Sequence, residues 1–177
     1  MASRTAQELR ERIDAAWENL SGQIKGMDPH LEHADAPGEW TAREVLSHLL
    51  FEPGFDPAKL LGCFAERDYP LVEINPGDTF LDDHRRRLTL AQFYQALDAQ
   101  RRGVLAYIDG LLERDFERKA RIPLFKQFMG TDEITISMYL GALFDYHWND
   151  HAGQLEKIRQ AVGLGSPAAA PPRGVRA

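Results

Sequence analysis

The residues with the clearest capacity for chemistry are two histidines near the C-terminal end of the chain, His147 and His151. They lie in segment 136–162, where apolar residues and these two histidines recur every three or four positions. This spacing puts them on one face of a helix, so a long helix is predicted. This stripe comprises Ile136, Leu140, Leu143, His147, His151, Leu155, Ile158 and Val162. At about 1.5 Å of rise per residue, the two imidazoles would stand about 6 Å apart on one face. They could bind one metal ion together, or they could be core histidines that hydrogen-bond to their neighbours.

A third histidine, His48, lies on the inner face predicted for an earlier helix, together with Val45 and Leu49. Three neutral imidazoles leave one coordination position open, which is typical of catalytic rather than structural metal sites. Zinc, nickel, copper and iron accept nitrogen ligands, whereas calcium and magnesium prefer oxygen ligands. From the residues alone, a divalent transition-metal site and a group of satisfied core histidines are both open interpretations.

Two carboxylates are candidates for the catalytic residues of such a site. Glu52 lies one turn beyond His48, and Asp150 is next to His151. Either could orient an imidazole, bind the metal or activate a nucleophile, or could simply be a carboxylate on a helix surface. The pattern differs from that of a zinc protease, because Trp148 occupies the position where those enzymes carry a catalytic Glu.

Two further features have both a chemical and a structural interpretation. The run Arg85–Arg87 is either a solvated basic loop or a clamp for an anionic group, because guanidinium groups match carboxylates. Cys63 lies in an apolar run, so we expect it to pack rather than to act as a nucleophile. As the lone cysteine of the chain, it excludes an internal disulfide and a cysteine-rich zinc site.

Four amphipathic helices are predicted to position these residues, at about 5–25, 41–52, 89–112 and 135–162, with a short helix at about 57–66. Three of them begin with a capping box, in which a Thr side chain accepts from a free backbone N–H and an acid or amide reaches back. The Thr residues of these boxes are Thr5, Thr41 and Thr89. No segment combines the length and the alternation that indicate a β-strand.

The segments between the helices, 27–40, 53–88 and 113–134, are longer than neighbouring up-and-down helices need. We therefore predict an all-α fold, a four-helix bundle with long crossover connections, in which at least one connection crosses the bundle. Residues 1–163 would form this domain. Residues 164–177 are rich in Ala, Pro and Gly, which predicts a disordered tail.

The composition limits the partners of the protein. A net charge of −6 disfavours nucleic acid, because phosphate binding needs a basic face. The N-terminus lacks the apolar segment of a signal peptide, and no apolar run approaches the roughly 20 residues that cross a membrane. We therefore expect a cytoplasmic protein that binds neither a membrane nor nucleic acid.

Two segments together resemble the DinB-like (DinB/YfiT) family of metalloenzymes. They are Trp40-Thr41-x-Arg43-Glu44-Val45-x-x-His48-Leu49 and His147-x-x-x-His151-x-x-Gln154-Leu155-x-x-Ile158-Arg159. The resemblance covers residues 5–162 and implies a four-helix bundle of unusual connection order, often found as a homodimer. It also implies a divalent metal, typically zinc or nickel, bound by one histidine of the second helix and two of the last. His48, His147 and His151 match those positions.

Some members of this family are S-transferases or isomerases that use low-molecular-weight thiols such as mycothiol or bacillithiol. The resemblance therefore implies a metal-dependent thiol S-transferase or detoxification enzyme that acts on a small molecule. A thiol at the open metal position would lose its proton and become a nucleophile at neutral pH. The alternatives are a metal-dependent hydrolase, with Glu52 or Asp150 as the base, and a non-catalytic stress protein that binds a metal or ligand.

Overall fold

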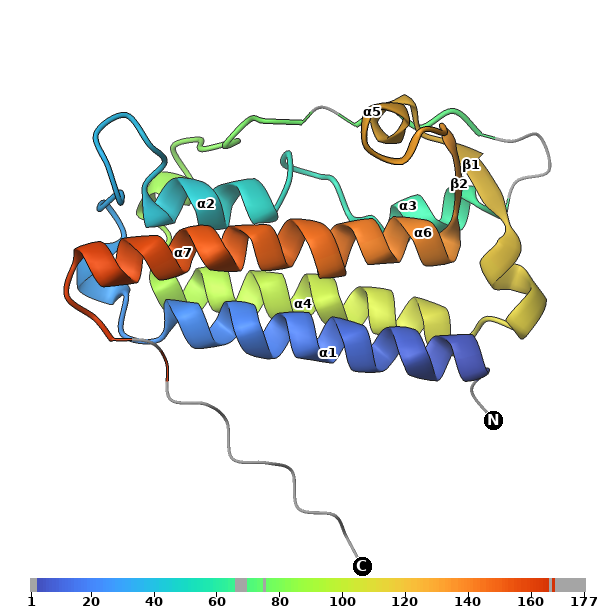
Figure 1. Ribbon diagram of the computed structural model, residues 1–177, viewed down its shortest axis with the longest axis horizontal. Coiled ribbons are helices and arrows are strands. Elements are labelled where there is room, and N and C mark those ends of the chain that lie inside the picture. The colour runs from blue at the N-terminus through green and yellow to red at the C-terminus, as the bar shows by residue number, and fades with distance from the viewer. Residues whose placement is uncertain (1–2, 66–69, 75, 166, 168–177) are drawn as a thin grey trace, which may run out of the picture.

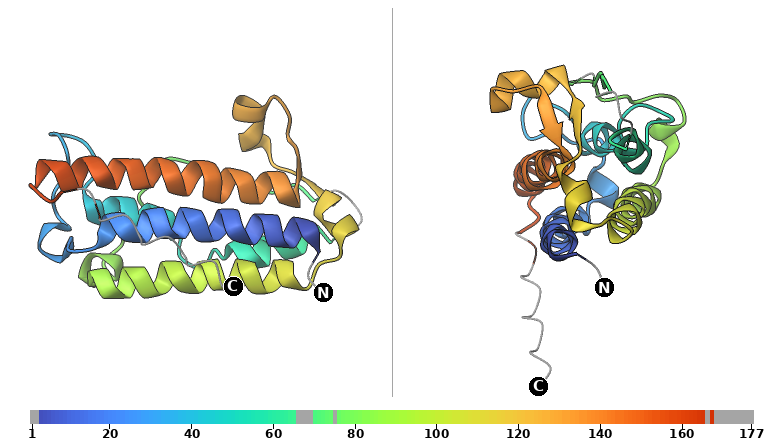
Figure 2. Two further views of the ribbon diagram at one scale, coloured as in Figure 1. Left: turned by 60° about the horizontal axis from the view of Figure 1, so that its bottom comes forward. Right: turned by 90° about the vertical axis from the view of Figure 1, so that its right-hand side faces the viewer.

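Four helical rods surround one apolar core in the computed structural model, which describes residues 3–65, 70–74, 76–165 and 167 (Figure 1). The rods are α1 (Arg4–Ile24), α2 (Ala42–Leu49) with α3 (Pro57–Cys63), α4 (Leu90–Asp109), and a fourth rod made of α6 (Ile136–Leu140), the π-helix η5 (Gly141–Trp148) and α7 (Asn149–Ala161). The end-on view in Figure 2 shows the rods side by side around their common axis. The predicted all-α four-helix bundle is confirmed.

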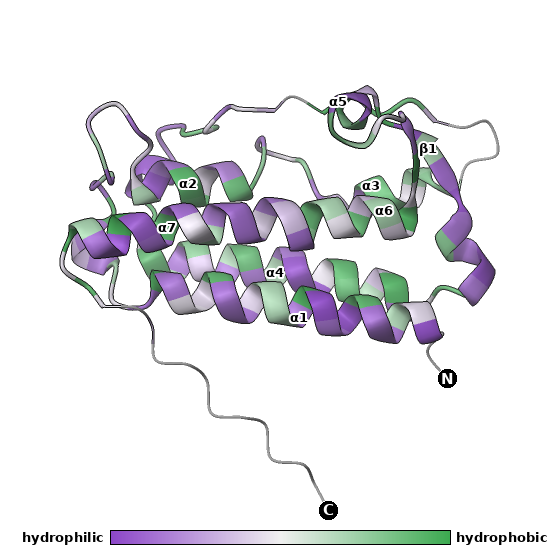
Figure 3. Ribbon diagram, viewed as in Figure 1, coloured by the Kyte–Doolittle hydropathy of each residue, from purple (hydrophilic) through white to green (hydrophobic). Residues whose placement is uncertain are grey.

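The core is formed by the apolar faces that the helices turn toward one another. Leu20, Phe93, Leu97, Phe144 and Trp148 have no exposed surface. Burial of a side chain of this size stabilises the folded state by about 1.5–3 kcal/mol relative to exposure. Hydrophilic residues cover the outward faces of α1 and α7 (Figure 3). Across the described ranges, no helix is both long and apolar enough to cross a bilayer.

The order of the rods requires long connections. α1 and the fourth rod run in one direction, whereas α2, α3 and α4 run in the other (Figure 1). Because α3 ends where α4 finishes rather than where it starts, the connection between them returns along the outside of the bundle. It ends in the 3₁₀ turn η2 (Arg85–Arg87). The predicted crossover is therefore confirmed.

A small sheet closes one end of the bundle, between α4 and α6. Strands β1 (Lys119–Arg121) and β2 (Glu133–Thr135) pair antiparallel, with Ala120 opposite Ile134, and both of these side chains are fully buried. The same connection holds the 3₁₀ turns η3 (Glu113–Glu117) and η4 (Pro123–Phe125) and the short helix α5 (Lys126–Met129). The prediction of no strand was wrong. Strands of three residues are too short to show an alternation of apolar and polar side chains, and they form because they pair with each other.

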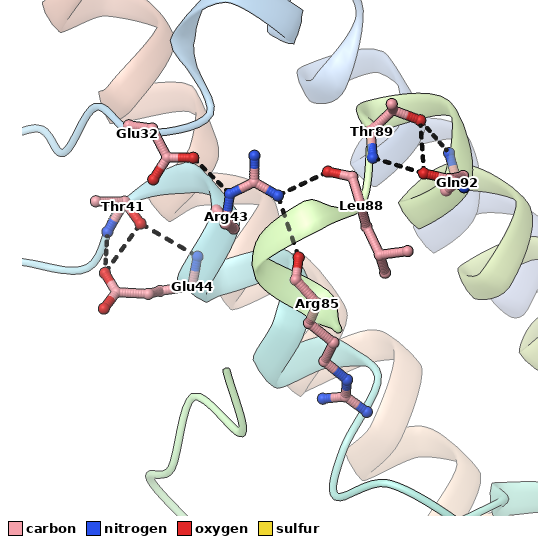
Figure 4. Close-up of polar contacts among 8 residues, drawn as sticks. All are labelled: Glu32, Thr41, Arg43, Glu44, Arg85, Leu88, Thr89 and Gln92. Carbon is pink, nitrogen blue, oxygen red and sulfur yellow. Dashed lines mark hydrogen bonds and ion pairs between the residues drawn. The ribbon is translucent and has the colours of Figure 1, made fainter. Parts of the chain in front are cut away.

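The helix starts follow local side-chain chemistry, with one exception. Thr41 and Thr89 each form the predicted capping box, with Glu44 and Gln92 (Figure 4). Thr5 does not, because α1 begins earlier: Ser3 Oγ accepts a hydrogen bond from the backbone N–H of Ala6. The Thr5 hydroxyl instead donates to Glu113 in η3.

A buried arginine joins the ends of α1 and α7. Arg159 Nη1 donates to the carbonyl oxygens of Gln23 and Lys25, and Nη2 donates 2.9 Å to the carbonyl oxygen of Gly165. Leu164 also packs partly buried against the core, so the chain is held to the bundle just beyond the predicted domain end. Residues 166 and 168–177 of the predicted tail lie outside the described residues.

We predict that Arg159→Met lowers the free energy of unfolding by about 2–4 kcal/mol, because it removes charged hydrogen bonds from three carbonyl oxygens. Urea unfolding followed by circular dichroism measures this change. Arg102→Met is the control: its side chain is 67% exposed and pairs with Asp98, so we expect a loss of about 1 kcal/mol or less. Equal losses in the two variants would contradict the structural role assigned to Arg159.

Candidate metal centre

Three histidines from two rods converge between α2 and the junction of η5 with α7. Their ring centroids are 4.9 Å apart for His48 and His147, 4.7 Å for His48 and His151, and 4.8 Å for His147 and His151. One ring nitrogen of each lies within 4.8 Å of the other two. Nitrogen ligands at about 2.0–2.1 Å from one transition metal occupy a space of this size. The structure thus brings the three candidate ligands together.

Hydrogen bonds to the far side of two rings set where their protons lie. His48 Nδ1 is 2.6 Å from the carbonyl oxygen of Asp78, and a carbonyl can only accept, so Nδ1 carries the proton of a neutral His48. His151 Nδ1 is 2.9 Å from Gln154 Oε1 and donates to it in the same way. Both rings therefore present the lone pair of Nε2. Metal-binding histidines are commonly oriented by acceptors of this kind.

Unlike His48 and His151, His147 has no hydrogen-bond acceptor at its Nδ1 among the described residues. Its Nε2 lies 2.8 Å from Nε2 of His48, while its Nδ1 is buried and has no partner among the described residues. In the metal-free protein, Nε2–H of His147 can donate to the lone pair of His48. Three neutral imidazoles, two of which carry their proton on Nδ1, form a donor set that fits a divalent transition metal rather than calcium or magnesium.

The π-helix η5 determines which way His147 points. A π-helix turns less per residue than an α-helix, so it changes the phase of the side chains before and after it, and such segments are frequent at functional sites. Here Trp148 and Ala152 are buried in the core, whereas His147 and His151 are only partly buried. The Asn149 side-chain amide donates to two carbonyl oxygens of the π-helix, those of Phe144 and Asp145.

Each of the three imidazoles lies nearly parallel to an aromatic ring. The pairs are His151 with Trp40 (6.1 Å between centroids, 7° between planes), His147 with Phe51 (5.7 Å, 19°) and His48 with Phe80 (6.4 Å, 8°). Trp40, the residue before the Thr41 N-cap of α2, thus contributes its ring to the surroundings of the histidines.

Phe51 and Phe80 also share an unusual backbone conformation. Their φ angles are 58° and 50°, and within the described part of the chain no other residue except glycine has a positive φ. This left-handed conformation costs a residue with a β-carbon roughly 1–2 kcal/mol. Backbone strain of this kind concentrates at functional sites, where the surrounding structure holds it in place.

Burial keeps the imidazoles neutral and their lone pairs available. It lowers the pKa of His147 from 6.5 to about 3, with a further lowering from the neighbouring His151 and His48. Burial also lowers the pKa of His48 and of His151, although their hydrogen bonds to Asp78 and Gln154 act in the opposite direction.

The two candidate catalytic carboxylates lie outside this group. Glu52 is exposed and lines a cavity between α2, α3 and α4. Asp150 is exposed on α7, and its charge offsets a small part of the lowering of the His151 pKa by burial. Among the described residues, the group of metal-ligating side chains contains no carboxylate and no cysteine, and Cys63 is a partly buried free thiol at the end of α3. Catalytic roles for Glu52 and Asp150 stay predictions.

Comparison with solved structures supports this fold. The chain is similar to YfiT from Bacillus subtilis, which is described as a probable metal-dependent hydrolase with an unusual four-helix bundle topology. The match has a TM-score of 0.71 and covers 93% of this chain and 91% of that chain, at 17% sequence identity. No family model and no curated protein matches the chain. At this identity the likeness shows the fold, and at that level it confirms the resemblance found in the sequence.

Two residues around the histidines, Asp78 and Phe80, carried no signal that sequence analysis could use, whereas Gln154 did. Asp78 acts through its backbone carbonyl, which any residue would supply. Phe80 lies in the irregular connection before α4 and has no periodic pattern around it. Gln154 belongs to the motif quoted above, and its spacing of three residues from His151 would have placed the two on one face of a helix.

We predict that the metal-free protein loses stability as the pH falls below about 6.5. The unfolded state then takes up a proton on His147, whereas the folded state takes it up only near pH 3, so the free energy of unfolding falls with pH between these values. One such group contributes a slope of about 1.4 kcal/mol per pH unit. Urea unfolding with a chelator present, from pH 7.5 to 4.5, measures the slope.

His147→Gln should flatten this pH dependence, and the exposed His33 provides the matched control, His33→Gln. If His147→Gln and the unmodified protein had the same slope, the assignment of the proton uptake to this buried imidazole would be wrong.

Proposed function

We propose that the chain is a metal-dependent enzyme that transfers a low-molecular-weight thiol to an electrophilic small molecule, with His48, His147 and His151 as its metal ligands. A divalent ion on three neutral imidazoles keeps an open position and lowers the pKa of a thiol that reaches it. The observation that carries the proposal is the convergence of the three rings, two of them with their protons held on Nδ1. Zinc or nickel would suit this nitrogen set.

The surroundings of the histidines support a thiol rather than water as the nucleophile. A free thiol has a pKa of about 8.5 and bulk water one of about 15.7; a metal would lower both, and the thiol, which starts from the lower value, depends less on a general base. Across the described ranges, no carboxylate lies in the metal-ligating group. Trp40, Phe51 and Phe80 instead give the site aromatic walls, which suit the carbon skeleton of an electrophile.

Hydrolysis is the second candidate, because YfiT is described as a probable metal-dependent hydrolase. This reaction needs a base for the attacking water. Asp150 is the better candidate, since its charge acts on His151, whereas Glu52 lines a cavity formed with α4. A non-catalytic metal- or ligand-binding protein is the third candidate, and it would bind the ion without turnover. A homodimer and a cytoplasmic location also belong to this proposal.

The deciding experiment supplies thiols and an electrophile to the metal-loaded protein. We expect one metal ion per chain and conjugation of 1-chloro-2,4-dinitrobenzene that requires both the ion and an added thiol. His48→Ala, His147→Ala and His151→Ala should each lose the metal and the conjugation, measured by elemental analysis and absorbance, whereas the control His33→Ala should keep both.

Other outcomes would replace the proposal. Turnover of ester or amide substrates without thiol would favour hydrolysis, and loss of that turnover in Asp150→Asn but not in Glu52→Gln would assign the base. One bound ion per chain without either kind of turnover would support the third candidate, a non-catalytic binding protein. A histidine variant that kept the ion would contradict the ligand set.

We further predict that Gln154→Met weakens metal binding by about 10- to 100-fold, because His151 loses the acceptor that holds its proton on Nδ1. Competition with a chromophoric chelator measures this affinity. Gln160→Met, on the same helix and two turns away, is the control and should leave it unchanged. Unchanged affinity in Gln154→Met would show that the hydrogen bond does not serve metal binding.

A further inference from the structure

A cavity of about 370 Å³ lies between the end of α2, the start of α3 and the middle of α4. Its apolar lining includes Leu50, Phe55, Ala96 and Ala99, and its polar lining includes Arg85, Glu52, Asp56 and Gln100. This volume lies within the range of about 300–1,000 Å³ that is usual for small-molecule sites. An apolar wall with a few convergent polar groups is the composition expected of such a site.

Arg85 is the feature that indicates a ligand. Only 7% of this residue is exposed, and none of the carboxylates in the described residues forms an ion pair with it. Burial lowers the pKa of Arg85 and the charge of Asp82 raises it in part, and an arginine stays charged. An unpaired charge in a buried position is costly. A residue that only filled space would not need this charge.

Hydrogen bonds fix the Arg85 side chain through one nitrogen. Nη1 donates 2.8 Å to the carbonyl oxygen of Ser47, 3.3 Å to its hydroxyl and 3.3 Å to the carbonyl oxygen of Phe80. Arg43 in turn donates to the backbone carbonyl oxygen of Arg85, and Figure 4 shows the Arg85 guanidinium pointing away from that contact. The group is therefore positioned before any ligand arrives.

The other two nitrogens remain available. In the described part of the chain, Nε and Nη2 of Arg85 have no hydrogen-bond partner, yet they are not among the polar atoms shut off from solvent. Because Arg85 lines the cavity, we infer that these two nitrogen atoms are accessible to a ligand in the cavity. Nε and Nη2 form the edge of a guanidinium that binds a carboxylate through two parallel hydrogen bonds.

The remaining polar groups of the cavity are acceptors. Glu52 is exposed and makes no ion pair with any described residue. Asp56 Oδ1 caps α3 by accepting from the N–H of Ala58, and Gln100 Nε2 donates to the carbonyl oxygen of Leu49, which leaves its Oε1 as an acceptor. With two carboxylates and one guanidinium in its lining, the cavity suits a ligand that brings a positive charge together with its carboxylate.

We propose that this cavity binds a small zwitterion, a molecule with a carboxylate and a protonated amine on one carbon and an apolar side group, as in a free amino acid. The carboxylate bonds to Nε and Nη2 of Arg85. The amine bonds to Glu52, and the side group lies against Phe55 and the alanines of α4. A dianion such as inorganic phosphate is disfavoured by Glu52 and Asp56. The proposal does not depend on the reaction at the metal centre.

The test compares three probes of similar shape on the full chain, by isothermal titration calorimetry with a chelator present. We expect L-leucine to bind, and 4-methylpentanoate, which lacks the amine, and 3-methylbutylamine, which lacks the carboxylate, to bind at least about tenfold more weakly. No heat with L-leucine at millimolar concentration, or equal binding of L-leucine and the amine, would overturn the proposal.

Variants locate the binding. Arg85→Lys should weaken L-leucine by more than about tenfold, because it lacks the two-pronged edge. Glu52→Gln should weaken the binding of L-leucine but should not weaken the binding of 4-methylpentanoate, because only L-leucine brings an amine to this carboxylate. Since Arg85 is buried and its variant could unfold, Ala99→Leu fills the cavity from an exposed helix position, and Ala106→Leu, exposed on the same helix outside the cavity, is the control. Equal binding by these two leucine variants would also overturn the proposal.

Discussion

The close approach of His48 Nε2 to His147 Nε2, at 2.8 Å, is the constraint on which the rest of the site depends. Two imidazole nitrogens at this distance need a proton or a cation between their lone pairs. Burial opposes a charged imidazole, and the carbonyl of Asp78 holds the proton of His48 on the far nitrogen. The three neutral rings therefore turn nitrogen atoms toward one another, and either a proton of His147 or a bound cation can lie between the close pair.

The fold holds two strained residues against the histidines. The left-handed backbones of Phe51 and Phe80 cost roughly 1–2 kcal/mol each, and the packing of their half-buried rings offsets part of this cost. Phe80 and Asp78 both come from the connection that returns along the bundle between α3 and α4. A bundle with short loops would bring the three histidines together but would lack this wall and the acceptor for His48. The long crossover is thus part of the site.

What the sequence could predict was local or periodic. The boxes at Thr41 and Thr89 depend on residues three apart, and the inner-face histidines followed from helical spacing. The predicted N-cap of α1 was wrong because Ser3 and Thr5 can both cap a helix. Thr5 instead contacts Glu113, a residue far along the chain, and local sequence does not predict such a contact. The π-helix was missed because the apolar spacing of residues 141–148 also fits an α-helix. The small sheet, Asp78 and Phe80 depend on contacts between distant segments.

The metal centre and the cavity share structural elements, so their ligands need not act independently. Arg85 Nη1 binds the carbonyl oxygens of Ser47, which precedes His48, and of Phe80, whose ring lies against His48. A ligand in the cavity that changed the position of Arg85 would therefore act on the two residues that flank the His48 imidazole, Ser47 and Phe80. Coupling between binding sites is reciprocal, so an ion that changed the affinity of the cavity for a zwitterion would have its own affinity changed by the same factor. The buried arginine is therefore the contact through which such coupling would pass.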